Sequence, residues 1–170
     1  MKNIITTIIC LLTLTTFNAQ EFTINSEKST IEFNYIGEDA VGTINGVTGI
    51  IKFDPSDLSN SYFEGRANIA TINTSNKTRD AHLNAPDYFN TKKYPEIIFK
   101  SESITLSDDK YVLSGQLTIK DISKGEKINF SFENGVFVGQ CIIYSNDYEI
   151  HNRKKREDSK ILIKISVPVL

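Results

Sequence analysis

The sequence has little tryptophan, methionine or cysteine, and cysteine is the residue that reinforces many small folds by covalent bonds. It has no tryptophan, one methionine and two cysteines among its 170 residues. Cys10 lies in an apolar N-terminal run, so that only Cys141 remains if this run is removed and no intramolecular disulfide can form. A single thiol among apolar neighbours is expected to behave as a small hydrophobic side chain rather than a nucleophile. The core alone must then hold the fold together.

The chain also lacks a strong charge of either sign, with 19 basic and 21 acidic residues. Without residues 1–19, which contain Lys2 and no acid, 18 basic and 21 acidic residues give a formal charge of −3. This balance predicts no nucleic-acid partner. The basic run at residues 153–156 is interpreted as a solvated loop between strands. The alternative is a transient contact with an anionic membrane surface.

No apolar run reaches the length of about 20 residues that crosses a bilayer. Residues 4–14 form a shorter apolar run after Lys2, and Phe17-Asn18-Ala19 follows it. This arrangement is typical of a secretory signal peptide. We therefore predict a signal peptide over residues 1–19, one domain over residues 20–170, and a periplasmic or secreted location.

Apolar and polar residues alternate with a period of two through most of the remaining chain, which is typical of strands with one buried face. Clear examples are residues 31–35, 113–119 and 161–167, and Asn134-Gly135 is a strong hairpin signal. About eight such strands without a long helix predict an all-β fold, either a closed antiparallel barrel or a sandwich. Closure removes exposed strand edges and favours the barrel. The periodicity leaves open whether its interior is filled or contains a lumen.

Residues 71–101 interrupt the strands and predict two short helical turns. Asp80 is expected to cap the first turn, because its side chain can accept a hydrogen bond from a free backbone amide. His82 and His151 have no second ligand at suitable spacing, so no metal site is predicted. Asp80 and His82 are two residues apart and do not face each other on a helical turn. Structural roles are therefore favoured for Arg79, Asp80 and His82, and neither catalytic residues nor an enzyme are expected.

The same stretch resembles the signature of the YceI-like family. The matching features are RD-x-HL at residues 79–83, the aromatic pair at 88–89 and K-Y-P-E-I-x-F-K-S at 93–101. Further matches at residues 46–54 and 115–120 follow in the expected order, so the resemblance covers nearly the whole chain after residue 20. The chain departs from the family pattern at Lys28, where members often have histidine, and at residues 145–150, which lead into a basic loop.

The resemblance implies an exported protein with a lipocalin-like barrel that binds polyisoprenoid or similar long-chain lipids. A polyprenyl, quinone-type or other amphiphile would be the ligand, and no cofactor is expected. Arg79, His82, Tyr88 and Phe89 would form the mouth and meet a polar head group. The predicted lining consists of inward-facing apolar residues: Ile31, Phe33, Ile51, Phe53, Ile69, Phe99, Leu117, Ile119, Phe130 and Ile163.

Three hypotheses for the function remain at this stage. The first is a periplasmic or secreted lipid-binding protein that carries, stores or scavenges its ligand. The second is a barrel with a filled core that acts as a stress-related or protein-interaction module. The third is a lipid-modifying enzyme that uses Arg79, Asp80 and His82. A homodimer is a further possibility for the oligomeric state.

Overall fold

The computed structural model describes residues 19–170, so the predicted signal peptide lies outside the described residues except for Ala19. This part of the chain contains ten strands, one α-helix and six short 3₁₀ turns. The strands are β1 (Gln20–Phe22), β2 (Thr30–Tyr35), β3 (Ala40–Asn45), β4 (Thr48–Phe53), β5 (Tyr62–Asn68), β6 (Glu96–Ser107), β7 (Lys110–Ile119), β8 (Ile122–Glu133), β9 (Val136–Tyr144) and β10 (Lys160–Pro168). The helices are α1 (Lys77–Asn84) and the 3₁₀ turns η1 (Ser26–Lys28), η2 (Ile36–Glu38), η3 (Leu58–Asn60), η4 (Ile69–Thr71), η5 (Ser145–Tyr148) and η6 (Arg156–Ser159).

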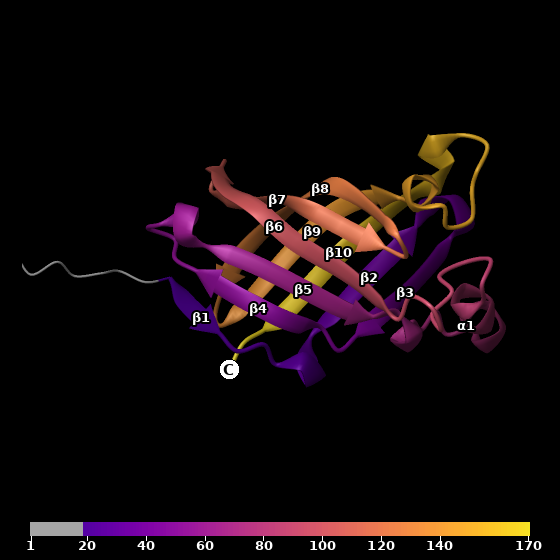
Figure 1. The fold of residues 1–170 in the computed structure, drawn as a ribbon, viewed down its shortest axis with the longest axis horizontal. Helices are drawn as coiled ribbons and strands as arrows, with labels where there is room; N and C mark the ends of the chain where they lie inside the picture. The colour runs from indigo at the N-terminus through magenta and orange to yellow at the C-terminus, as the bar shows by residue number, and fades with distance from the viewer. Residues whose placement is uncertain (1–18) are drawn as a thin grey trace, which may run out of the picture.

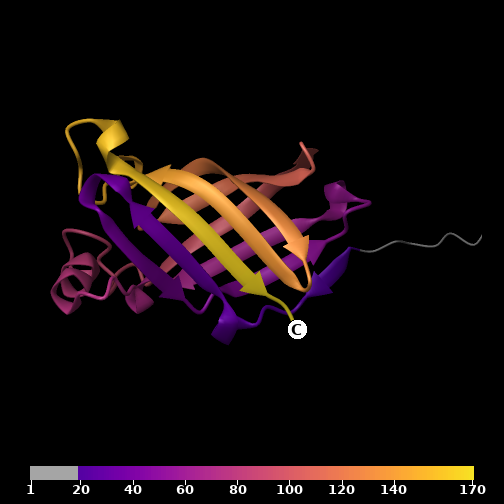
Figure 2. The same ribbon diagram turned by 180° about the vertical axis from the view of Figure 1, so that it is seen from behind.

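All ten strands belong to one antiparallel sheet with the order β1-β4-β5-β6-β7-β8-β9-β10-β2-β3. The sheet curls around a common interior, as the two opposite views show (Figures 1 and 2). The predicted all-β, lipocalin-like class with a short helical insertion is confirmed, with ten strands rather than about eight. The hairpin at Asn134-Gly135 is also present, and both residues adopt positive φ, 51° and 74°.

The terminal strands β1 and β3 are not joined by a ladder within residues 19–170. Instead, β3 is bonded to the segment that follows β5. Thr43 and Asn73 exchange two backbone hydrogen bonds of 2.9 Å. The amide of Asn45 donates to the Thr71 hydroxyl at 3.0 Å. The segment between β5 and α1 therefore closes this side of the curled sheet.

One end of the barrel is filled by aromatic rings, which we call the aromatic floor. Phe53 lies at its centre and is 3% exposed. Its ring centroid is between 5.0 and 6.2 Å from those of five neighbours, all in edge-to-face orientations: Phe63, Tyr111, Phe130, Phe132 and Phe137. Such pairs contribute about 0.5–1.5 kcal/mol each beyond the burial of their area.

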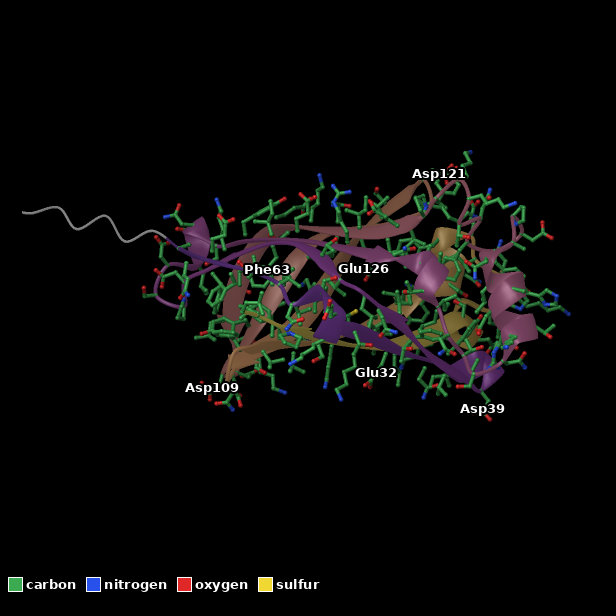
Figure 3. The ribbon with its side chains drawn as sticks, turned by 90° about the horizontal axis from the view of Figure 1, so that it is seen from below. Glu32, Asp39, Phe63, Asp109, Asp121 and Glu126 are labelled. Atoms are coloured by element: carbon green, nitrogen blue, oxygen red, sulfur yellow. The ribbon has the colours of Figure 1, made fainter. Side chains whose placement is uncertain are left out.

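The opposite end carries α1, the tip of the β2–β3 hairpin and the long loop of residues 145–159 (Figure 1). Figure 3 shows Asp39 and Asp109 at the two opposite ends, with Phe63 between them. Of the described residues, none lies in a helix of the length and apolarity needed to cross a membrane.

The aromatic floor predicts a large loss of stability when its central ring is removed. We expect Phe53→Ala to lower the free energy of unfolding by about 3–5 kcal/mol, because it leaves a cavity among rings that cannot collapse. Urea denaturation followed by circular dichroism measures this change. The control is Leu106→Ala, since Leu106 is 59% exposed and its loss should change stability by less than about 0.5 kcal/mol. Equal effects of the two substitutions would contradict the account of the floor.

Candidate functional site

A cavity of about 550 Å³ lies above the aromatic floor and extends toward the end that carries α1. Its volume falls within the range of about 300–1,000 Å³ typical of small-molecule sites. Inward-facing residues of most strands form an apolar wall, and polar side chains gather at the α1 end. The period-two pattern left open whether the interior is filled or contains a lumen. In the structure, the end with the aromatic floor is filled and the other part contains a lumen.

Twelve of the fourteen predicted ligand-binding residues line this cavity. They are Ile31, Phe33, Ile51, Arg79, His82, Tyr88, Phe89, Phe99, Leu117, Ile119, Phe130 and Ile163. Their role in binding remains a prediction.

Phe53 and Ile69 do not line the cavity. Phe53 is enclosed by the other rings of the floor. Ile69 lies in η4, beyond the end of β5, and packs at 1% exposure against Ile44, Ala67 and Ile72. Both face inward as the alternation predicts, but other core side chains separate them from the lumen.

Thr74 fixes α1 to the mouth of the cavity. The Thr74 amide and hydroxyl both donate to Asp80 Oδ1, at 2.9 and 2.5 Å. Arg79 donates from Nε to the Thr74 hydroxyl at 2.9 Å and from Nη2 to its carbonyl at 3.0 Å. The prediction that Asp80 caps the helix is wrong, because Asn76 is the N-cap and accepts from the amides of Thr78 and Arg79. The first acceptor upstream of the helix takes this role, and Asp80 in the first turn reaches back to Thr74.

Arg79 and Asp80, the RD pair of the family signature, therefore hold α1 in position at the mouth. His82 is exposed and lines the cavity without a hydrogen bond to Asp80. Residues 19–170 contain no group of three or more His, Cys, Asp or Glu side chains arranged to hold a metal ion. The arrangement suits contact with a polar group at the mouth better than general-base chemistry, which requires an oriented imidazole.

A second polar cluster joins separate loops across the mouth. Glu38 at the tip of the β2–β3 hairpin pairs with Arg153 Nη1 at 2.7 Å and lies 3.2 Å from His151 Nε2. The His151 ring stacks on Tyr88, with centroids 5.5 Å apart. Arg153 also donates to the carbonyl of Gly37 at 3.0 Å. The loop after α1, the hairpin tip and residues 145–159 are thereby held together around the opening.

The basic loop is only partly the solvated segment that its composition predicts. Arg156 donates to both oxygens of Asp147, at 2.9 and 2.5 Å, and its guanidinium lies 3.5 Å from the centre of the Tyr144 ring. The Arg156 hydrogen bonds hold the pKa of Asp147 below its usual range. Lys154 and Lys155 are exposed. Two of the four basic residues therefore shape the loop, and two face solvent.

Two residues of the wall, Tyr148 from this loop and Glu126 from β8, are absent from the predicted lining. Tyr148 is fully buried and donates its hydroxyl to Glu126 Oε1 at 2.9 Å. Burial and this hydrogen bond raise the pKa of Tyr148. The pair Tyr148 and Ile150 in an otherwise polar stretch could have indicated that this loop reaches the interior, because such side chains are often buried.

Comparison with known proteins assigns this fold to a family. A family model described as the YceI-like domain matches residues 22–169, nearly all of the described chain. The chain belongs to the YceI-like family. Among curated relatives, a UPF0312 protein of Photorhabdus laumondii is 35% identical over 88 residues, which cover 52% of this chain and 46% of the relative. Protein YceI of Escherichia coli is 30% identical over 83 residues, 49% of this chain and 44% of the relative. This chain therefore spans about half the length of the relatives it matches or less.

Solved structures of YceI-like proteins and their neighbours share the fold at lower identity. BcnA of Burkholderia cenocepacia superposes with a TM-score of 0.74 at 18% identity, covering 85% of this chain and 98% of BcnA. A domain of Saccharophagus degradans described as polyisoprenoid-binding gives a TM-score of 0.62 at 10% identity, covering 89% and 98%. At these identities the superpositions support the shared fold.

Cys141 lines the cavity and provides a chemical probe of it. Burial raises the pKa of its thiol to about 12. A raised pKa means less thiolate at pH 8, so we expect alkylation by iodoacetamide to be about a thousandfold slower than that of free cysteine. Peptide mass spectrometry measures the rate at this residue alone.

A matched control replaces Cys141 by serine and introduces Ser103→Cys at an exposed position of β6. The introduced thiol should react at a rate close to that of free cysteine. Equally fast reaction at Cys141 would place its thiol in contact with solvent and contradict its position in the wall.

Proposed function

We propose that this YceI-like protein binds one isoprenoid or other long-chain amphiphile, with its apolar chain in the cavity. The observation that carries the proposal is the apolar lumen of about 550 Å³ between a solid floor and a polar mouth. Each CH₂ group that moves from water into such a wall contributes roughly 0.8 kcal/mol. The structural neighbour described as polyisoprenoid-binding supports the same class of ligand.

The polar head group would point toward the mouth, where Arg79, His82 and Tyr88 line the opening. Arg79 uses Nε and Nη2 to hold Thr74, and His82 is exposed. These side chains supply hydrogen-bond donors to a head group without burying an isolated charge, which would be costly. The proposed role is therefore binding and carriage rather than chemical conversion.

In the proposed setting the protein acts in the periplasm or outside the cell as a carrier, store or scavenger. Exposed Lys154 and Lys155, in the loop at the mouth end, support a transient contact with an anionic membrane surface during transfer. Each basic residue near such a surface adds about 1 kcal/mol to the attraction. This contact would bring the opening, rather than the floor, to the source of the lipid.

Native mass spectrometry of the mature protein purified from an exporting host tests the proposed function. We expect a one-to-one adduct that organic extraction releases as an identifiable polyprenyl or long-chain species. Polyprenols and quinones added to extracted protein should restore the adduct. Failure of both the purified protein and these additions to give any adduct would contradict lipid binding.

Gly65 allows the lumen to be blocked without disturbing the fold. A Cβ at Gly65 would have no heavy atom within 4 Å, and the residue lines the cavity with no positive φ. We expect Gly65→Ile to weaken binding of a long-chain alcohol by at least about tenfold, because the new side chain occupies the space of the ligand's chain. Competition with a fluorescent long-chain alcohol probe measures the affinity.

The matched control is Gly125→Ile on the exposed part of β8, where a Cβ would meet nothing nearer than 4.0 Å. It should leave affinity unchanged. Unchanged affinity in folded Gly65→Ile would place the ligand outside this cavity.

A further inference from the structure

The barrel wall splits between β8 and β9 on the side nearer the mouth. The ladder between these strands runs only from the pair Asn129–Gln140 to the pair Glu133–Val136. From Ile128 toward the mouth, β8 continues to pair with β7 as far as Ile122. Strand β9 meanwhile continues along β10. Backbone hydrogen bonds thus close the wall near the floor, and side chains must close it farther up.

Tyr148 and Glu126 are the side chains that meet at the split. Tyr148 comes from η5 and packs with Ile119, Ile143 and Ile150. Its hydroxyl donates to Glu126 Oε1 at 2.9 Å. Both residues line the cavity, and Figure 3 shows Glu126 in the middle of the molecule, between Phe63 and the mouth end. Glu126 is half-buried, and a carboxylate is therefore built into the wall of a mostly apolar lumen.

Glu126 differs from the other carboxylates that line the cavity. Glu38 is paired with Arg153 and Glu64 with Arg66, each at 2.7 Å. Glu126 takes part in none of the ion pairs found among residues 19–170, and its Oε2 accepts no hydrogen bond there. Burial raises its pKa, while the Tyr148 hydroxyl favours the ionised form and opposes that rise. One oxygen is held by the protein and the other is left to accept a bond.

We propose that Glu126 makes the cavity selective for apolar ligands that carry a hydrogen-bond donor into it, such as the hydroxyl of an alcohol or a reduced quinol. This inference rests on the proposed function and specifies its ligand class. A hydroxyl donates to the free oxygen and satisfies it, whereas an ether leaves it without a donor. A carboxylate or phosphate within a few ångströms is repelled, and the apolar wall screens that repulsion less than water does. Sites that hydrogen-bond a ligand hydroxyl discriminate strongly against analogues that lack it.

The test compares three ligands with one short isoprenoid chain that fits within the cavity: farnesol, its methyl ether and farnesoic acid. Affinities are measured at pH 7.5 with the full-length chain, in wild type, in Glu126→Gln and in Glu32→Gln. Glu32 is exposed on β2, so Glu32→Gln is a control that also removes one carboxylate. Glutamine at position 126 still offers an acceptor to Tyr148, so circular dichroism should show an unchanged unfolding midpoint.

We expect wild type and Glu32→Gln to bind farnesol at least about tenfold more tightly than farnesoic acid, and Glu126→Gln to reduce this ratio to less than about threefold. Equal binding of alcohol and acid by wild type would overturn the inference without any variant. The same ratio in both variants would also overturn it. If all three ligands bind equally, lipid binding stands and the role of Glu126 falls. If none binds, the proposed function fails as well.

Discussion

The packing of aromatic rings around Phe53 is the constraint on which the rest of this structure depends. The described chain has no disulfide, and its terminal strands lack a shared ladder. Close packing of rings from β1, β4, β5, β7, β8 and β9 therefore has to hold the strands together at one end. Because that end supplies a dense core, the other end can keep a lumen that is not tightly packed. In the proposed function, the floor also sets the depth to which the apolar chain of the ligand can enter.

Polar contacts take over where the core ends. Thr74 ties α1 to the segment after β5, Glu38 joins the hairpin tip to Arg153, and Asp147 holds Arg156 within the long loop. Such partly exposed pairs contribute little to stability individually. Their value here is geometric, because they fix three loops around one opening. The mouth is thus shaped by directional bonds, whereas the floor depends on buried apolar area.

The sequence could predict which residues face inward but not how deep each one lies. The period-two pattern is a local property, and it predicts that Ile31 and Ile163 face inward, where both line the cavity. Phe53 and Phe99 share that pattern, yet only Phe99 reaches the lumen, because depth depends on where the curled strands cross. Tyr148 and Glu126 could not be paired from the sequence, since the split between β8 and β9 arises from the divergence of two strands. The prediction of the helix cap was wrong for a similar reason. Asn76 and Asp80 are both nearby acceptors, and tertiary contacts decide which of them caps the helix.

The central claim is that one apolar chain lies in the lumen and stops at the aromatic floor. The most direct measurement is the binding free energy of a homologous series of straight-chain alcohols, determined by calorimetry with lipid-extracted protein. The account predicts a gain approaching roughly 0.8 kcal/mol for each added CH₂ until the chain reaches the floor, followed by a plateau. An affinity that is independent of chain length from the shortest member onward would contradict it, as would a gain that continues without limit.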